Sequence, residues 1–159
     1  MCLAAGLLPV VVYAYAPELA EKIQLDLGTR GDIPYRNDYK YFLQPWMTGY
    51  HGPERFANQA LEAVENNAVI YADSTTVAPL LYVQEVKGTR PDVKIVSGTA
   101  KSKDAPRFDE TTIEQLLRDS HIYVVSSKPG YCPAFILDKY ELVQAGLLWR
   151  VVKNPKIKD

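Results

Sequence analysis

The feature that most constrains this chain is an uncharged N-terminal run, residues 2–16. Exposing so many apolar side chains to water is unfavourable. Three interpretations are therefore open: a membrane helix, a signal peptide or a buried core helix. The run is shorter than the roughly eighteen residues of a spanning helix. Ala14-Tyr15-Ala16 has the A-x-A form of a cleavage site, but no Lys or Arg stands before the run. We favour the last part of a membrane helix, apolar on all faces and making few contacts with the α/β domain.

Composition excludes several functional classes. The 159 residues include 18 Lys and Arg against 19 Asp and Glu, for a net charge of −1. No basic surface for nucleic acid is therefore expected, and nucleic acid is excluded as a partner. The two cysteines and two histidines show none of the close spacings of metal ligands. We predict neither a metal nor a cofactor.

The sequence divides into three segments of different character. Residues 1–17 form the apolar helix, and Glu18 is the first acidic residue after it. Residues 18–53 are rich in Gly, Pro, Tyr and Trp, which indicates an ordered but irregular connecting segment. Residues 54–159 show regular periodicity and are predicted to form an α/β domain.

In the third segment, helical and strand patterns alternate. Apolar residues recur at helical spacing from Phe56 to Val64, and short β-branched runs suggest strands at 68–72, 93–97 and 121–126. Helices are predicted between the strands, near 77–87 and 112–118. This order favours a small Rossmann-like sandwich, in which three parallel strands are joined by right-handed crossovers and flanked by helices.

The C-terminal end has a different pattern. Two β-like runs, 140–144 and 147–152, surround Ala145-Gly146. A two-residue connection favours an antiparallel hairpin. A single helix over 139–152 is the alternative, although Gly146 would stand in its middle.

Candidate ligand-binding residues follow two of the predicted strands. Asp73 and Ser74 come after the first strand and Ser126 after the third, and ligands of parallel sheets gather at this edge. Asp73 could be a nucleophile, as in phosphatases of the haloacid dehalogenase type, but Thr75 replaces their second aspartate. Capping of the next helix by Asp73 or Ser74, and an ordinary turn at Ser126, are the favoured interpretations. No glycine-rich phosphate loop is present.

Cys132 is the other candidate nucleophile. A catalytic thiolate needs a nearby base, and no spacing relates His51 or His121 to Cys132. We therefore expect a structural thiol and assign no catalytic residue.

A third group of candidates lies in the aromatic stretch at residues 32–52. Arg36, Asp38 and Trp46 could line a sugar-binding surface, because aromatic rings stack on sugars and charged groups bond their hydroxyls. A Trp and Tyr belt beside a membrane is equally consistent. The rings could also simply anchor the segment to a core. The belt and anchoring interpretations together are favoured over the sugar site.

Three stretches carry a resemblance to a known family. They read D-I-P-Y-R-N-D-Y-K-Y-F-L-Q-P-W from residue 32, A-V-I-Y-A-D-S-T-T from residue 68, and L-L-Y-V-Q-E-V-K-G-T-R-P-D-V from residue 80. Together they resemble the C-terminal end of the protein O-mannosyltransferase-like family, catalogued as a domain of unknown function. Its members resemble lipid-sugar-dependent glycosyltransferases with many membrane helices.

The resemblance spans about residues 8–152 and implies a C-terminal piece of a longer protein. The family's presumed catalytic carboxylates lie in an early loop that has no counterpart here, so none is carried over. The implied function is an extracytoplasmic, non-catalytic domain that packs on the membrane part or assists acceptor binding. The implied partners are the membrane, through the N-terminal helix, and the membrane-embedded part of the same system. The alternative is a free-standing small α/β enzyme, or a nucleotide-sugar-binding protein, with its site at Asp73 and Ser126.

Overall fold

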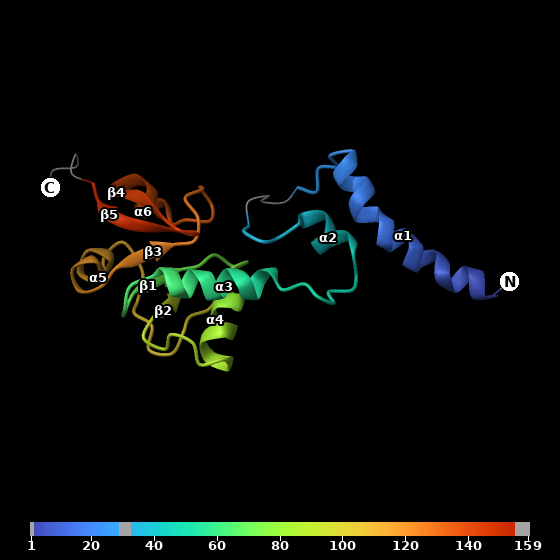
Figure 1. Ribbon diagram of the computed structural model, residues 1–159. Helices are drawn as coiled ribbons and strands as arrows, with labels where there is room; N and C mark the ends of the chain where they lie inside the picture. The colour runs from blue at the N-terminus through green and yellow to red at the C-terminus, as the bar shows by residue number, and fades with distance from the viewer. Residues whose placement is uncertain (1, 29–32, 155–159) are drawn as a thin grey trace. The chain divides into compact units, whose positions relative to one another are not determined.

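The computed structural model describes residues 2–28 and 33–154 and divides into two compact units (Figure 1). The units are Met1–Gly52 and Pro53–Asp159.

The first unit consists of a long helix, a short helix and irregular chain. Helix α1 spans Cys2–Lys22 and α2 spans Asp38–Leu43, and the two pack against each other. Helix α1 is longer than the predicted 2–16, because it continues through Pro17 into the polar residues beyond. Within the described residues, no helix combines the length and the apolarity needed to cross a bilayer.

The second unit is a mixed α/β fold built on a five-stranded sheet. The strands lie in the order β2-β1-β3-β5-β4. Strand β1 pairs in parallel with both β2 and β3, whereas β5 is antiparallel to β3 and β4. The α/β class predicted from the sequence is confirmed. The strands are β1 (Val69–Tyr71), β2 (Lys94–Val96), β3 (Ile122–Val124), β4 (Tyr140–Ala145) and β5 (Leu148–Lys153).

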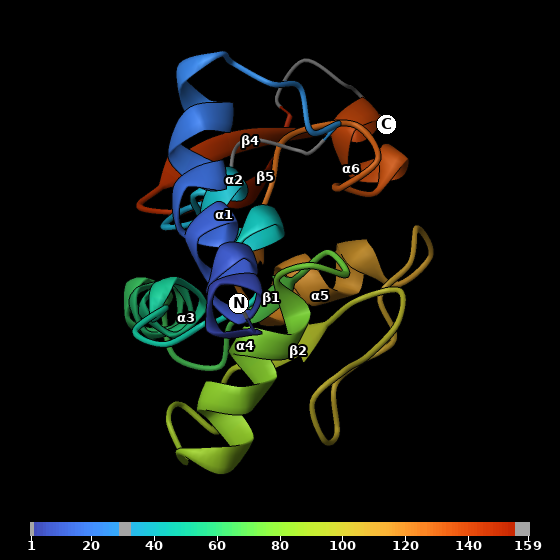
Figure 2. The same ribbon diagram turned by 90° about the vertical axis from the view of Figure 1, so that its right-hand side faces the viewer.

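Helices cover both faces of the sheet. On one face, Ile70 of β1 and Ile95 of β2 are buried in a cluster with Leu61 of α3 and Leu80 of α4. On the other face, strand residues including Val124 are buried in a cluster with residues of α5 and α6. Figure 2 shows α3 and α5 on opposite sides of β1. The helical segments are α3 (Gly52–Ala63), α4 (Val77–Leu81), the π-helix η1 (Tyr82–Val86), α5 (Ile113–Asp119) and α6 (Ala134–Lys139).

The two C-terminal strands form the predicted antiparallel hairpin, with Ala145 opposite Leu148. Gly146 has a φ of 63° in the turn, a backbone conformation that glycine adopts without steric cost. The alternative of one helix over 139–152 is wrong. The hairpin extends the sheet because β5 pairs with the free edge of β3.

Two helical features differ from the sequence prediction. The helix predicted over 77–87 changes from α to π geometry at Tyr82, and α6 was not predicted. Helix α6 has only six residues and follows Pro133, so its apolar pattern is too short for a periodicity argument.

Candidate functional site

The predicted strand-edge residues belong to neighbouring strands of the sheet. Tyr71 of β1 lies opposite Val124 of β3 in the parallel register. Asp73 and Ser126 each come two residues further along the chain, at the carboxyl edge of the sheet. Both are buried, with 7% and 3% of their surfaces exposed. The shared edge predicted for them is therefore present.

The Asp73 carboxylate is engaged by the backbone of the following turn. Its Oδ1 atom accepts N–H bonds from Thr75, at 2.8 Å, and Thr76, at 3.1 Å. The Asp73 carbonyl accepts from the N–H of Val77, the first residue of α4, at 3.0 Å. These contacts satisfy N–H groups of the turn at residues 74–76, which leads into α4. The N-cap residue of α4 is Thr76, and no side chain caps it, so the Asp73 carboxylate stabilises the turn before the helix.

Ser74 and Ser126 have different surroundings. Ser74 is exposed, whereas the Oγ of Ser126 accepts the N–H of Lys128 at 3.2 Å. The Ser126 contact is a local turn of the kind that serine forms at the end of a strand.

We expect Asp73 to act on stability and not on turnover. Asp73→Ala should lower the free energy of unfolding by about 1 kcal/mol, the usual net value of a hydrogen bond, because the turn before α4 loses its acceptor, whereas Asp73→Asn keeps an acceptor oxygen and should cost less. Ser74→Ala, at the neighbouring exposed position, should change little. Urea unfolding followed by circular dichroism measures all three. Hydrolysis of a generic phosphate ester, or transfer from a lipid-linked sugar, that disappears in Asp73→Asn would contradict this role.

Cys132 lies in the cluster beneath α5 and α6 and is 5% exposed. Burial raises the pKa of its thiol from 9.0 to about 12, because an apolar environment disfavours the thiolate. The thiol therefore stays protonated at neutral pH and is a poor nucleophile.

This burial predicts slow alkylation. In a Cys2→Ser background, iodoacetamide should modify folded Cys132 at least about tenfold more slowly than the urea-unfolded chain, because burial raises the thiol pKa and shields the sulfur. Mass spectrometry at fixed times gives both rates. Similar rates in the folded and unfolded chains would show that Cys132 is accessible and ionised.

In the first unit, Arg36 and Asp38 form a largely buried ion pair. The Nε of Arg36 lies 2.5 Å from Oδ1 of Asp38, with 10% and 14% of the two side chains exposed. The Arg36 guanidinium also lies 5.0 Å from the ring centre of Tyr41 and 5.6 Å from that of Phe42. These cation–π contacts and the ion pair hold the guanidinium in one place.

Arg36 and Asp38 also line a pocket in this unit, the α1–α2 pocket, of about 480 Å³. It is formed by the last residues of α1, the chain after it and the start of α2. Trp46 is half-buried and is not among the lining residues. Of the predicted aromatic-stretch candidates, the structure thus brings together Arg36 and Asp38. The polar and aromatic lining residues are Glu21, Gln24, Asp26, Arg36, Asn37, Asp38 and Tyr39.

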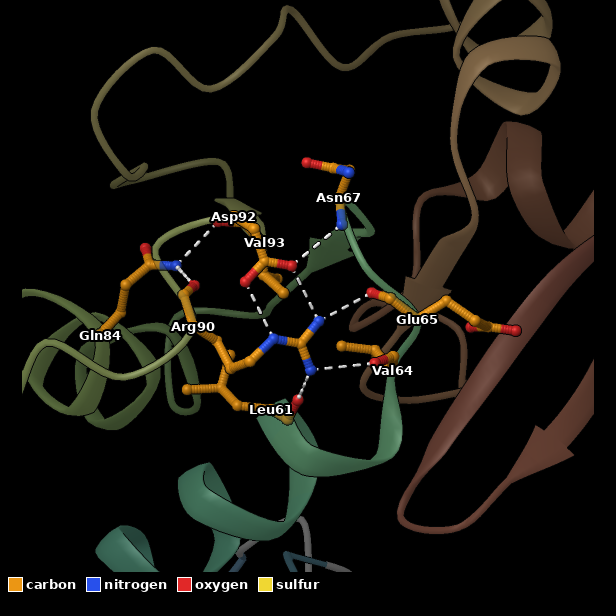
Figure 3. A network of polar contacts seen from close by, with 8 residues as sticks. All are labelled: Leu61, Val64, Glu65, Asn67, Gln84, Arg90, Asp92 and Val93. Carbon is orange, nitrogen blue, oxygen red and sulfur yellow. Dashed lines mark hydrogen bonds and ion pairs between the residues drawn. The ribbon is translucent and has the colours of Figure 1, made fainter.

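Arg90 is the centre of a polar network that the sequence analysis did not identify (Figure 3). Its Nη1 donates to the carbonyls of Leu61, at 2.6 Å, and Val64, at 3.0 Å, and its Nη2 donates to that of Glu65 at 2.9 Å. These carbonyls lie at the end of α3 and just after it, so Arg90 satisfies acceptors that a helix end leaves without partners.

Asp92 and Gln84 complete this network. Asp92 accepts two bonds of 2.9 Å from the Arg90 guanidinium and one of 3.0 Å from the N–H of Asn67. The Gln84 amide, from η1, donates to the carbonyls of Arg90 at 2.8 Å and Val93 at 2.7 Å. Arg90 has a φ of 52°, a conformation that costs about 1–3 kcal/mol for a residue other than glycine. The T-R-P-D-V segment of the resemblance therefore has a structural role here.

The described residues offer no metal centre, since no group of three or more His, Cys, Asp or Glu side chains among them could hold an ion. No family model, curated protein or solved structure matches the chain.

Proposed function

We propose that the chain is a non-catalytic domain of a membrane glycosyltransferase-like protein of the protein O-mannosyltransferase-like kind, held at the membrane by α1. The observation that carries the proposal is the exposure of the apolar part of that helix. Residues 8–15 are all exposed, among them Leu8 at 64% and Tyr15 at 67%. The extracytoplasmic side and the family come from the sequence resemblance alone.

Exposure of α1 favours a lipid or membrane-protein environment. Full burial of one Val or Leu side chain is worth about 1.5–3 kcal/mol, and the helix presents Leu8, Val10, Val11 and Val12 to solvent. These residues follow one another along the chain and so point to different sides of the helix. A helix without a polar face is suited to surroundings that are apolar on every side.

The polar and aromatic residues of α1 are consistent with one end at the membrane surface. Glu18, Glu21 and Lys22 are exposed in the last part of the helix. Tyr13 and Tyr15 precede them, and tyrosine is enriched where hydrocarbon meets water. Helix α1 would then have an apolar end in the membrane and a charged end in water.

The non-catalytic role is supported by the strand-edge residues. The Asp73 carboxylate bonds the backbone of the turn before α4, and the Ser126 hydroxyl is part of another turn. Cys132 is buried and its thiol pKa is raised. As part of the same proposal, we infer that β2, β1 and β3 with their helices are a small Rossmann-like unit, which serves here as a scaffold.

Membrane attachment predicts a large effect of lysine in α1. Leu8→Lys combined with Val12→Lys places two charges on one helix face and should reduce binding to phosphatidylcholine vesicles by more than tenfold. At the centre of a bilayer, replacing an apolar residue by lysine costs about 3 kcal/mol of insertion free energy. The cost is smaller near a helix end, where the lysine side chain can extend to water. Co-flotation of the full chain with vesicles gives the bound fraction.

The matched control is Val86→Lys, which replaces a valine that is 69% exposed in η1. It adds a lysine at an exposed apolar position outside α1 and should leave vesicle binding unchanged. Equal loss in both variants, or no flotation of the unmodified chain, would refute membrane attachment through α1. The family proposal has a separate test, because the genomic reading frame upstream should encode membrane helices.

A further inference from the structure

We propose that the α1–α2 pocket is a binding site for a neutral carbohydrate of one or two sugar rings. This inference concerns only residues of the first unit and does not depend on membrane attachment or on the proposed family. Its volume of about 480 Å³ lies in the range of small-molecule sites, about 300–1,000 Å³.

The charges of the described lining residues disfavour anionic ligands. Glu21, Asp26 and Asp38 contribute three carboxylates, and Arg36 is the only cationic side chain among the described lining residues. Arg36 is itself paired with Asp38, so Glu21 and Asp26 leave the described lining with a net negative charge. A phosphate or carboxylate ligand would be repelled, whereas sugar hydroxyls can donate hydrogen bonds to carboxylate oxygens.

The lining also supplies donors and an aromatic face. Gln24 carries an amide NH₂ group, and the Arg36 guanidinium has five N–H donors, of which Nε–H is directed to Asp38. Tyr39 is also among the lining residues, and an aromatic face can pack against the C–H face of a pyranose. Hydroxyl groups both donate and accept, so a sugar can use both kinds of partner at once.

Part of this lining is ordered without a ligand. Arg36 is fixed by its ion pair and by the rings of Tyr41 and Phe42. Asp26 is oriented by the N–H of Gly28, which donates to Oδ1 at 2.8 Å. A ligand that enters a preorganised site loses less free energy to the ordering of side chains.

Two cationic occupants would compete with this interpretation. A bare metal ion is disfavoured, because the described lining holds no set of three close metal-ligating side chains. An organic ammonium group would satisfy the negative charge but would leave the donors of Arg36 and Gln24 without acceptors. A neutral sugar can donate hydrogen bonds to the carboxylates and accept hydrogen bonds from Arg36 and Gln24.

Saturation-transfer NMR on the full chain in aqueous buffer, without lipid, tests the site. The probes are maltose and methyl glucoside as neutral sugars, spermidine as an ammonium ligand and inorganic phosphate as an anion. We expect transfer to a sugar ring, with a Kd of about 1 mM. Glu21→Gln and Tyr39→Ala should each weaken binding about tenfold, through loss of a charge-assisted bond and of the stacking face.

Matched controls are Glu62→Gln, at an exposed glutamate of α3, and Tyr82→Ala, at a tyrosine of η1 that is 50% exposed. Both should bind the sugar as the unmodified chain does. Circular dichroism verifies that every variant is folded. Absence of sugar transfer, equal transfer in pocket variants and unmodified chain, or a preference for spermidine or phosphate would each overturn the proposal.

Discussion

Arg90→Met is expected to lower the free energy of unfolding of the Pro53–Asp159 unit by about 3 kcal/mol. Methionine retains most of the aliphatic stem but removes the guanidinium, which donates to three carbonyls around the end of α3 and to Asp92. About 1 kcal/mol is the usual net value of a hydrogen bond, and bonds to charged groups are worth more. Partial exposure of the ion pair, at 22% and 30%, reduces its share.

Two further effects add to the loss of stability: Asp92 loses a hydrogen-bond partner, and the backbone conformation at residue 90 loses contacts that maintain it. Without the guanidinium, Asp92 loses its strongest partner and keeps the N–H of Asn67. The left-handed conformation at residue 90 remains, with fewer contacts to maintain it. Urea unfolding of the full chain followed by circular dichroism gives the difference.

The matched control is Arg118→Met, at an exposed arginine of α5, which should change stability by less than about 0.5 kcal/mol. Similar losses at the two positions would show that the network around Arg90 contributes nothing specific.

The same network predicts how this stabilisation depends on pH. The hydrogen bond from Arg90 holds the pKa of Asp92 well below its ordinary value of 3.8. A lowered folded-state pKa stabilises the fold above the unfolded value, and this contribution is lost as the pH falls towards the folded value. The difference between the unmodified chain and Arg90→Met should therefore be constant near neutral pH and shrink below about pH 4. A difference that grows on acidification would contradict this role for Asp92.

Ile70→Ala is expected to cost about 3–4 kcal/mol, within the range measured for large-to-small changes in a core. Ile70 is fully buried in β1, opposite Ile95 of β2 and Tyr123 of β3. Helices pack over this face of the sheet, so the space left by the removed atoms cannot be filled by solvent. Urea unfolding measures the loss.

Val143→Ala is the control for Ile70→Ala. Val143 lies on β4 at the edge of the sheet and is 47% exposed. Its truncation should cost less than about 1 kcal/mol, because little buried area is removed. Equal losses in the free energy of unfolding for the two substitutions would show that Ile70 in β1 is no more tightly packed than Val143 at the edge of the sheet.

Local pattern was sufficient for most elements of the second unit. Apolar spacing from Phe56 to Val64 indicated α3, and short β-branched runs indicated β1, β2 and β3. The connection through Gly146 indicated the hairpin. These features depend on residues close together in sequence, where backbone sterics and the alternation of apolar side chains act directly.

The chemistry of the candidate residues depended on contacts that spacing does not encode. The sequence alone determined that Asp73 and Ser126 follow strands, and so share an edge of the sheet. Only the tertiary structure decided that the Asp73 carboxylate turns towards the N–H groups of the turn before α4. A side chain at such a position can face a ligand or its own backbone, and the difference lies in rotations that the sequence pattern does not specify.

The sequence by itself thus determined the α/β class and favoured the hairpin and an apolar N-terminal helix, which in the structure continues to Lys22. The addition of the hairpin to β3, the Arg90 network and the α1–α2 pocket were decided by the tertiary structure. Arg90 bonds to residues 25–29 positions away. Such contacts form only after helices and strands have packed, because the positions of distant partners are set by the burial of apolar faces and not by local preference.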